Sequence, residues 1–323
     1  MLVEITGEHA PEAYVEAWQH IRLSRVREHS RNGPVLTIPT PTMLEIKNPL
    51  ERLITDPVRD ANPFFHMMEF IWVMAQESDV TFLEKFNKRY RQYAEDNGKV
   101  WGAYGPRWLE GDQLQNVVEG LRRDKNSRRA VLSMWNPELD SKGDKRDHPC
   151  NTHIYLRVSK GALDMLVCNR SNDMVWGMLG ANVVVFTMLQ ELIASELGIP
   201  LGTYRVVTNN LHVYEEMPRY AELQATGFAV QHCIYPCEQM PLLAVGESME
   251  EFMQDARWFV KGGFDSALST RWFNQVAYPM RMAYENKDER NTWLKKVASE
   301  DWRLAGMAWA ARRTSSLSTS TEP

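Results

Sequence analysis

The chain has 323 residues, of which 44% are hydrophobic and 24% are charged, so it can bury the core of a soluble globular protein. A net charge of −5 gives no general attraction to nucleic acid, and no run of about 18 apolar residues predicts a membrane span. The opening residues are acidic and include Pro11, unlike a signal peptide. We therefore expect a cytoplasmic protein, in the host cytoplasm if its source is viral.

The first third of the chain alternates helical and extended patterns. Apolar spacing predicts a helix over residues 11–31, and Thr, Ile and Val then favour an extended segment over residues 32–46. Two further helices are predicted over residues 63–76 and 79–98, and the second ends at an Asn-Gly pair.

The middle of the chain adds strands around one apolar helix. Strands are predicted over residues 129–135, 152–170 and 202–214, and a Lys-Gly pair forms a hairpin turn within the second segment. Residues 181–198 are apolar almost all round, as in a helix at the centre of a domain. This mixture predicts an α+β fold.

No repeat and no Gly/Ser linker divides the chain. We therefore expect a single catalytic domain over residues 1–311. The end, "RRTSSLSTSTEP", is polar and of low complexity, which predicts a disordered tail over residues 312–323.

Four cysteines are too few for a disulfide framework in a chain of this length. Cys150, in "DHPCNTH", is a candidate nucleophile, and its alternative is an inert buried thiol. Cys233 and Cys237 form a CxxxC pattern with no second ligand pair nearby, so we expect no metal.

Several separated motifs occur in a specific order: "MEFIW" at 68–72, "HPC" at 148–150, "NRSND" at 169–173, "GAN" at 180–182 and "NNLHVY" at 209–214. Together they resemble the thymidylate synthase family over roughly residues 15 to 260. The resemblance implies a bent mixed sheet packed with helices around a long buried helix. It also implies a homodimer that binds a pyrimidine nucleoside monophosphate, with 5,10-methylenetetrahydrofolate as co-substrate.

Three residues are expected to do the chemistry. By resemblance, Cys150 adds as a thiolate to C6 of the pyrimidine, which makes C5 nucleophilic, and the positive charge of Arg170 favours the thiolate. Glu69 stands in the apolar run "HMMEFIWVM" and matches a glutamate that organises water and proton transfer. Its alternative is a glutamate that faces solvent. Tyr104 matches a tyrosine near the reacting ring.

The phosphate is expected to bind arginines, whose guanidinium groups hold phosphate oxygens bidentately. The resemblance implies that Arg31, Arg170 and Ser171 come from one subunit, and that Arg128 and Arg129 reach the same phosphate from the other subunit. The alternative for Arg128 and Arg129 is a solvated surface pair.

The base, the sugar and the folate each have candidate residues by resemblance. Asn182 would read the base through its amide, and His212 and Tyr214, two residues apart on one strand, would contact the sugar hydroxyl. Asp173 would contact the pterin of the folate, or would cap the following turn. Tyr90 takes the place of a family tryptophan that lies along the folate.

Departures from the family pattern bear on the product. Asn151 follows the nucleophile instead of histidine, Asn210 replaces aspartate, and one residue is inserted between Gly177 and Asn182. Tyr90 covers less area than an indole, and the polar end "STSTEP" replaces an apolar end that closes the site.

A wetter site favours attack of water, instead of hydride, on the methylene group that forms at C5. We therefore expect 5-hydroxymethyl-dUMP and tetrahydrofolate. Three alternatives stay open: a dCMP or CMP hydroxymethylase, a thymidylate synthase that makes dTMP, and a non-enzymatic binding protein on the same scaffold. The amide of Asn182 favours uracil over cytosine, because it can donate to O4 and accept from N3-H.

Overall fold

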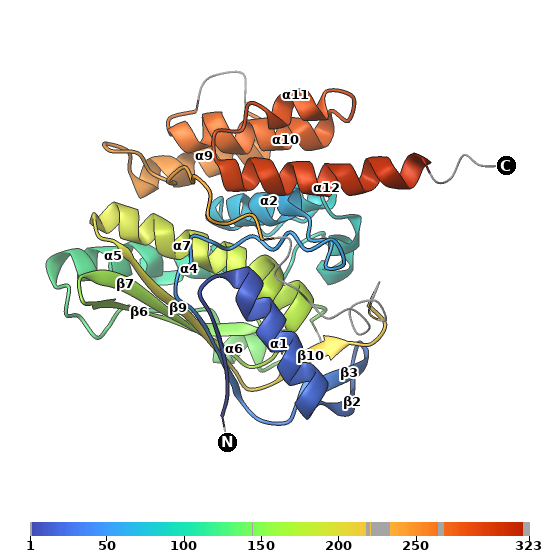
Figure 1. The fold of residues 1–323 in the computed structure, drawn as a ribbon. Coiled ribbons are helices and arrows are strands. Elements are labelled where there is room, and N and C mark those ends of the chain that lie inside the picture. Colours follow the sequence, from blue (N-terminus) through green and yellow to red (C-terminus); the bar gives the residue numbers. More distant parts are fainter. Residues whose placement is uncertain (1, 144, 218–219, 221–232, 264–267, 319–323) are drawn as a thin grey trace.

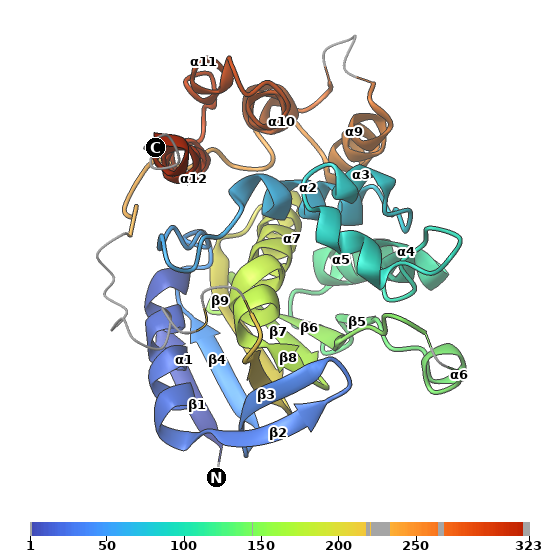
Figure 2. The same cartoon turned by 90° about the vertical axis from the view of Figure 1, so that its right-hand side faces the viewer.

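The larger of two sheets has six strands in the order β1-β4-β9-β7-β6-β5 (Figures 1 and 2). The computed structural model describes residues 2–143, 145–217, 220, 233–263 and 268–318. The sheet is mixed, because β1 runs parallel to β4 and β7 parallel to β9, while the other neighbours are antiparallel. The strands are β1 (Val3–Gly7), β4 (Thr42–Ile46), β5 (Val131–Ser133), β6 (Asn151–Ser159), β7 (Ala162–Asn169) and β9 (Leu201–Thr208).

A smaller sheet lies beside it, in the order β2-β3-β10-β8 (Figure 2). Its strands are β2 (Val26–Ser30), β3 (Gly33–Ile38), β8 (Asn172–Asp173) and β10 (Leu211–Tyr214). The helix predicted over residues 11–31 is therefore wrong at its end. Helix α1 stops at Ser24, because Leu23 is already 84% exposed and the following residues offer no apolar face, so they pair with β3 instead. The extended segment, the hairpin and the strand regions are confirmed.

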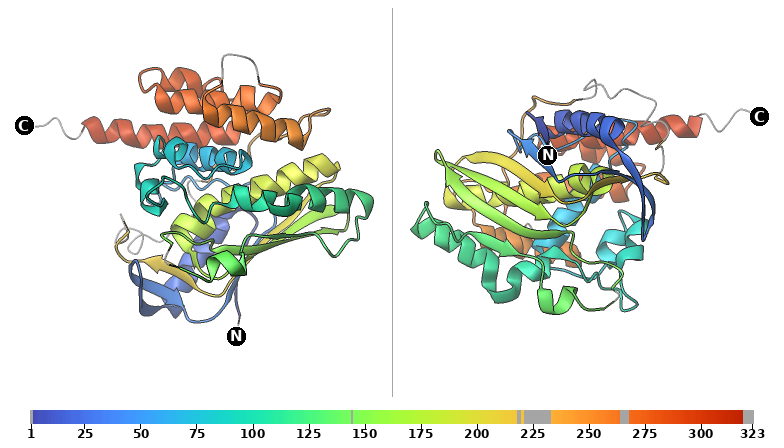
Figure 3. Two further views of the ribbon diagram at one scale, coloured as in Figure 1. Left: turned by 180° about the vertical axis from the view of Figure 1, so that it is seen from behind. Right: turned by 90° about the horizontal axis from the view of Figure 1, so that it is seen from below.

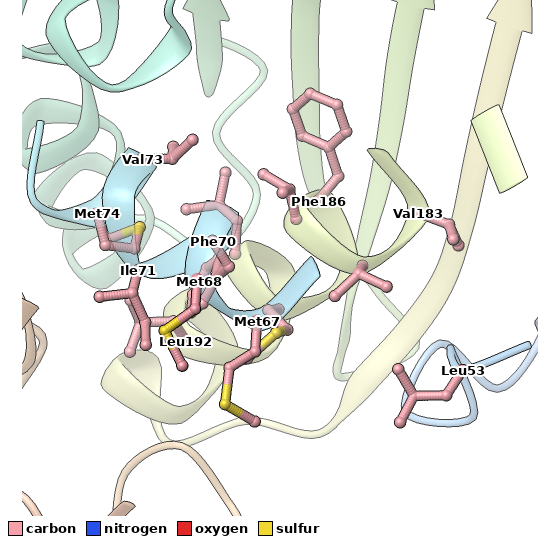
Figure 4. Packing of buried hydrophobic residues seen from close by; sticks show 14 of the residues in the cluster. Leu53, Met67, Met68, Phe70, Ile71, Val73, Met74, Val183, Phe186 and Leu192 are labelled. Atoms are coloured by element: carbon pink, nitrogen blue, oxygen red, sulfur yellow. The ribbon is translucent and has the colours of Figure 1, made fainter. Parts of the chain in front are cut away.

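Helices cover one face of the large sheet. The helices of the first two thirds are α1 (Ala10–Ser24), α2 (Pro63–Met74), α3 (Thr81–Glu84), η1 (Lys88–Tyr93), α4 (Tyr104–Leu109), η2 (Glu110–Asp112), α5 (Gln113–Arg123), α6 (Pro137–Asp140), η3 (Met174–Ala181) and α7 (Asn182–Leu197). Helix α7 is buried along most of its length between the sheet and α2, and Met67, Phe70 and Phe186 belong to this packing (Figure 4). The helices predicted over residues 63–76 and 181–198 are confirmed.

The stretch Met174–Leu197 is long and apolar enough to cross a membrane, but 83% of its most apolar window is buried inside the domain. Burial on all sides is what a helix in a protein core requires. The stretch is therefore a core helix, and the fold is α+β in one domain.

The long helix predicted over residues 79–98 is wrong. The chain forms only α3 and the 3₁₀ helix η1, because Asn87 leaves helical geometry and its side chain accepts from the amide of Arg89 to cap a new turn. Two isolated bridges, Asp79 to Lys99 and Ala94 to Val100, then close the segment into a loop. This loop places Tyr90 against one side of α2.

A last group of helices lies over α2, on the side away from the sheet (Figures 1 and 2). They are α9 (Met249–Lys261), η5 (Phe273–Ala277), α10 (Tyr278–Glu285), α11 (Arg290–Leu294) and α12 (Glu300–Ser318). Helix α12 continues to Ser318, whereas a disordered tail was predicted from residue 312. Arg312 and Arg313 hold this part by donating to Asp60 at 2.8 to 3.0 Å. Residues 319–323 lie outside the described residues.

Among the described residues, no helix covers the other face of the large sheet (Figure 3). Along β6, β7 and β9 buried residues alternate with accessible ones, so every second side chain points away from the core. Tyr155, 43% exposed, and the neighbouring ring of His153 lie on this open face.

Candidate active site

Cys150 stands directly before β6, where the amide of Arg170 donates to its carbonyl at 3.0 Å. The guanidinium group of Arg170 lies 3.8 Å from Sγ of Cys150 and also donates to the carbonyls of His148 and Pro149, each at 3.1 Å. Burial raises the pKa of the Cys150 thiol, and the charge of Arg170 opposes that rise. Arg170 is therefore fixed by backbone groups in a position that favours the thiolate.

Arg31 and Ser171 lie around the same loop. Arg31, at the turn between β2 and β3, donates to the carbonyls of Lys145 at 3.4 Å and Arg146 at 3.0 Å, just before Cys150. Ser171 follows Arg170, and its hydroxyl donates to Oδ1 of Asn210 at 3.4 Å. The same-subunit phosphate residues predicted from the sequence thus surround one loop.

Arg128 and Arg129 do not lie beside Cys150 of their own chain. Both are exposed, between α5 and β5. The carbonyl of Ala130 accepts from the amide of Leu156, which is six residues along β6 from Cys150. At about 3.3 Å per residue this is roughly 20 Å, much longer than an arginine side chain. In one chain alone, the pair is a surface pair.

Glu69 projects from α2 toward Tyr90, not toward open solvent. Its Oε2 atom is buried and has no hydrogen-bond partner, while its carboxyl group is hydrogen-bonded to Tyr90. Burial raises the pKa of Glu69 to about 7, the Tyr90 hydrogen bond lowers it and the charge of Asp147 adds to the rise. A carboxyl group with this pKa exchanges protons near neutral pH, which suits an acid and base role.

Tyr90 belongs to an aromatic cluster along one side of α2. Its ring lies 5.6 Å from Phe65, 6.2 Å from Trp72 and 5.6 Å from Tyr93, measured between ring centres. The phenol therefore has a fixed position from which it contacts Glu69. This contact was not predicted from the sequence, where Tyr90 appeared only in the place of a folate-binding tryptophan.

Asn151, which follows the nucleophile, links Tyr104 and Asn169 by hydrogen bonds. Its amide donates to the hydroxyl of Tyr104, and its Oδ1 accepts from Asn169 at 2.6 Å. Tyr104 begins α4 and packs against Phe186 of α7, with ring centres 5.6 Å apart. The replacement of histidine by Asn151 thus fixes the predicted catalytic tyrosine, a role that sequence reasoning missed.

The inserted residue between Gly177 and Asn182 is absorbed by a π helix, η3. A π helix accommodates one extra residue within a helix. Helix α7 therefore still begins at Asn182, whose amide donates to Oδ1 of Asn172 at 3.4 Å. Gly177 leaves room for this pair, since a Cβ atom there would lie 2.5 Å from Oδ1 of Asn172.

Asp173 caps η3. Its Oδ1 accepts from the amides of Val175 at 2.7 Å and Trp176 at 2.6 Å. This is the capping role that the sequence left open for Asp173. Its second oxygen, Oδ2, is buried without a hydrogen-bond partner, so one acceptor is left for an N–H donor such as those of a pterin.

His212 and Tyr214 point to the same side of β10, as their spacing predicted. Their rings meet edge to face, with centres 5.2 Å apart. Nδ1 of His212 lies 2.9 Å from Oδ1 of Asn210, and burial lowers the pKa of His212 while the charge of Asp173 raises it. Asn210 therefore fixes both His212 and Ser171.

Asp147 is a site residue that the sequence reasoning missed. It lies three residues before Cys150, and burial raises its pKa to about 6 although Arg170, Arg107 and Arg31 lower it. The signal that could have revealed it was an acidic residue immediately before the nucleophile motif "HPC".

Comparisons with known proteins identify the family of the chain. A family model described as Thymidylate synthase matches residues 14–233. A protein of Pseudomonas phage M6 named Deoxyuridylate hydroxymethyltransferase is 35% identical, over 96% of this chain and 94% of the phage protein. Proteins of the same name from Bacillus phage SP01 (38% identical) and Delftia phage PhiW-14 (35% identical) match about half of this chain and about half of their own length. The chain therefore belongs to the thymidylate synthase family.

Proposed function

We propose that this enzyme transfers a one-carbon unit from 5,10-methylenetetrahydrofolate to C5 of dUMP and releases 5-hydroxymethyl-dUMP and tetrahydrofolate. The observation that carries the proposal is the similarity along nearly the whole chain to the phage M6 protein, whose name is Deoxyuridylate hydroxymethyltransferase. The folate supplies the one-carbon unit. The residues of the chain bind, orient and move protons.

Cys150 attacks C6 of the pyrimidine, and Arg170 at 3.8 Å from its sulfur favours the reactive thiolate. Arg31, Arg170 and Ser171 hold the phosphate from the same subunit, and His212 and Tyr214 contact the sugar. Glu69, with a pKa of about 7, exchanges protons with the base through bound water. Tyr104, oriented by Asn151, lies beside the ring.

Asn182 reads uracil. Oδ1 of Asn172 accepts a hydrogen bond from one N–H of the Asn182 amide, so the amide nitrogen of Asn182 is oriented toward Asn172. The second N–H donates to O4 of uracil and the amide oxygen accepts from N3-H, whereas cytosine presents the reverse pattern. For the folate, Asp173 Oδ2 supplies an acceptor to the pterin, and Tyr90 contributes to the wall beside it.

The active enzyme is a homodimer that pairs two copies of the open sheet face. Tyr155 and its neighbours leave this face uncovered in one chain, and Arg128 and Arg129 lie too far along β6 to serve their own Cys150 (Figure 3). A two-fold pair would let both arginines reach the phosphate of the partner. We retain the cytoplasm as the location, the host cytoplasm for a viral chain.

The chemical identity of the product tests this proposal. The enzyme is incubated with methylenetetrahydrofolate and, separately, dUMP, dCMP or CMP in oxygen-18 water, and the products are weighed by mass spectrometry. We expect labelled 5-hydroxymethyl-dUMP with no dihydrofolate absorbance. An unlabelled methyl product with one dihydrofolate per turnover would identify a thymidylate synthase, and a preference for dCMP or CMP would overturn the assignment of the base.

A further inference from the structure

We propose that Asp147 is the general base that takes a proton from the water molecule attacking the methylene carbon at C5. This inference rests on the hydroxymethylation proposed above and assigns its water step to one carboxylate. Asp147 precedes Cys150 by three residues, on the loop whose carbonyls accept hydrogen bonds from Arg31.

The carboxylate of Asp147 lies among the reacting groups. It acts electrostatically on Cys150, Glu69, Tyr90 and Tyr104, which come from four separate segments of the chain. Gly102 makes room for it: a Cβ atom on Gly102 would lie 2.3 Å from Oδ2 of Asp147, and the Gly102 amide is hydrogen-bonded to the carboxylate. The fold therefore builds a specific place for this side chain.

No ion pair among the described residues accounts for the position of Asp147. In the described parts of the chain no cation lies within ion-pair distance of Asp147, although the charges of Arg170, Arg107 and Arg31 act on it; Arg107 is bound to Asp140 at 2.6 and 2.8 Å and Arg146 to Asp96. Its negative charge also raises the pKa of Cys150, which works against the thiolate. A largely buried carboxylate without an ion pair, which also raises the pKa of the nucleophile, is costly unless a later step of the reaction uses it.

Two carboxyl groups with different acidity can divide the proton transfers. Burial raises the pKa of Glu69 to about 7 and that of Asp147 to about 6, and Arg170, Arg107 and Arg31 account for part of the difference. At neutral pH Asp147 is ionised for a larger fraction of the time than Glu69, so it is more often available as a proton acceptor. Glu69 retains a proton for a larger fraction of the time and suits the donor role.

The step balances without a further reagent. The water oxygen bonds to the exocyclic methylene carbon, one water proton passes to the Asp147 carboxylate, and the electron pair of the exocyclic double bond moves to C5 and O4 as an enolate. The enolate then restores the C5–C6 double bond and expels the Cys150 thiolate. The proton on Asp147 passes to solvent.

The test separates this step from the earlier ones. Single turnovers with enzyme in excess are followed by tritium release from C5-labelled dUMP, which reports one-carbon transfer, and by formation of the hydroxymethyl product. We expect Asp147→Asn to keep tritium release near the wild-type rate and to slow hydroxymethyl formation about a hundredfold or more. Formate added to Asp147→Ala should restore part of this rate. The control, Asp96→Asn, changes an exposed carboxylate that is paired with Arg146 and should affect neither readout.

Each outcome has one reading. Hydroxymethyl formation at the wild-type rate in Asp147→Asn, or an equal loss of both readouts in both variants, overturns the assignment of the base. A wild-type enzyme that makes dTMP and dihydrofolate overturns the proposed function itself, whatever the variants do.

Discussion

The raised pKa of Glu69 leads to a prediction that separates its role in catalysis from its effect on stability. Its pKa rises from 4.5 in the unfolded chain to about 7 in the folded protein, mainly through burial. Between these two values the folded state binds more protons than the unfolded state, so the free energy of unfolding falls as pH rises. At 1.36 kcal/mol per pH unit, a shift of this size gives about 3 kcal/mol in full and about 2 kcal/mol between pH 5 and pH 8.

The variant Glu69→Gln removes this titration. As pH rises from 5 to 8, wild type should lose about 2 kcal/mol of unfolding free energy through the titration of Glu69, and the variant should not show this loss. Tritium release from C5-labelled dUMP should be lost in the variant. Urea unfolding at both pH values measures the first effect. Glu4→Gln, on the exposed side of the edge strand β1, is the control. An equal difference between wild type and Glu69→Gln at the two pH values would refute the reasoning, because other titrating groups are present in both proteins.

Three further predictions concern the site. Cys150→Ala should abolish turnover and leave dUMP binding measurable by calorimetry, since the proposed phosphate-binding arginines are unchanged; turnover near wild type would remove the thiolate from the reaction. Mixing inactive Cys150→Ala chains with inactive Arg128→Ala chains should restore activity in hybrid dimers, and hybrids shown to form but still inactive would contradict the shared phosphate site. Asn182→Asp should shift the ratio of kcat/KM values from dUMP toward dCMP, and an unchanged ratio would mean that Asn182 does not read the base.

The regular elements of the fold were largely predictable, because their patterns are local. The apolar runs around Met67 and Val184 predicted α2 and α7 within two residues of their ends. The helix predicted over residues 79–98 was wrong because the side chain of Asn87 accepts a hydrogen bond from the backbone amide of Arg89 and so interrupts the helix. Apolar periodicity does not reveal this competition between side-chain and helical hydrogen bonds. The end of α1 was misplaced for a similar reason, because strand pairing with β3 is a contact between segments.

The site was predictable where the family pattern applies and less so where this chain departs from it. The contact of Arg170 with Cys150 followed from motif order, and the burial of Glu69 followed from its apolar neighbours. The hydrogen bond between Asn151 and Tyr104 joins residues 47 positions apart and has no local signal. Asp147 was missed because its chemical environment comes from Gly102 and from α2, which sequence spacing does not bring together.

The two sheets are joined by very short connections. Residues 170–171 link β7 of the large sheet to β8 of the small one, and residues 209–210 link β9 to β10. Both connections carry groups of the site, Arg170 and Ser171 on one and Asn210 on the other. The two connections are also tied to each other, because the amide of Asn172 donates to the carbonyl of Asn210 at 2.8 Å and the amide of Asn209 donates to the carbonyl of Asn169 at 3.1 Å, so the seam between the sheets fixes the spacing between Arg170 and His212. We expect substitutions that repack Leu211, which is buried in the small sheet, to shift His212 relative to Arg170 and so to change the affinity for the proposed nucleotide.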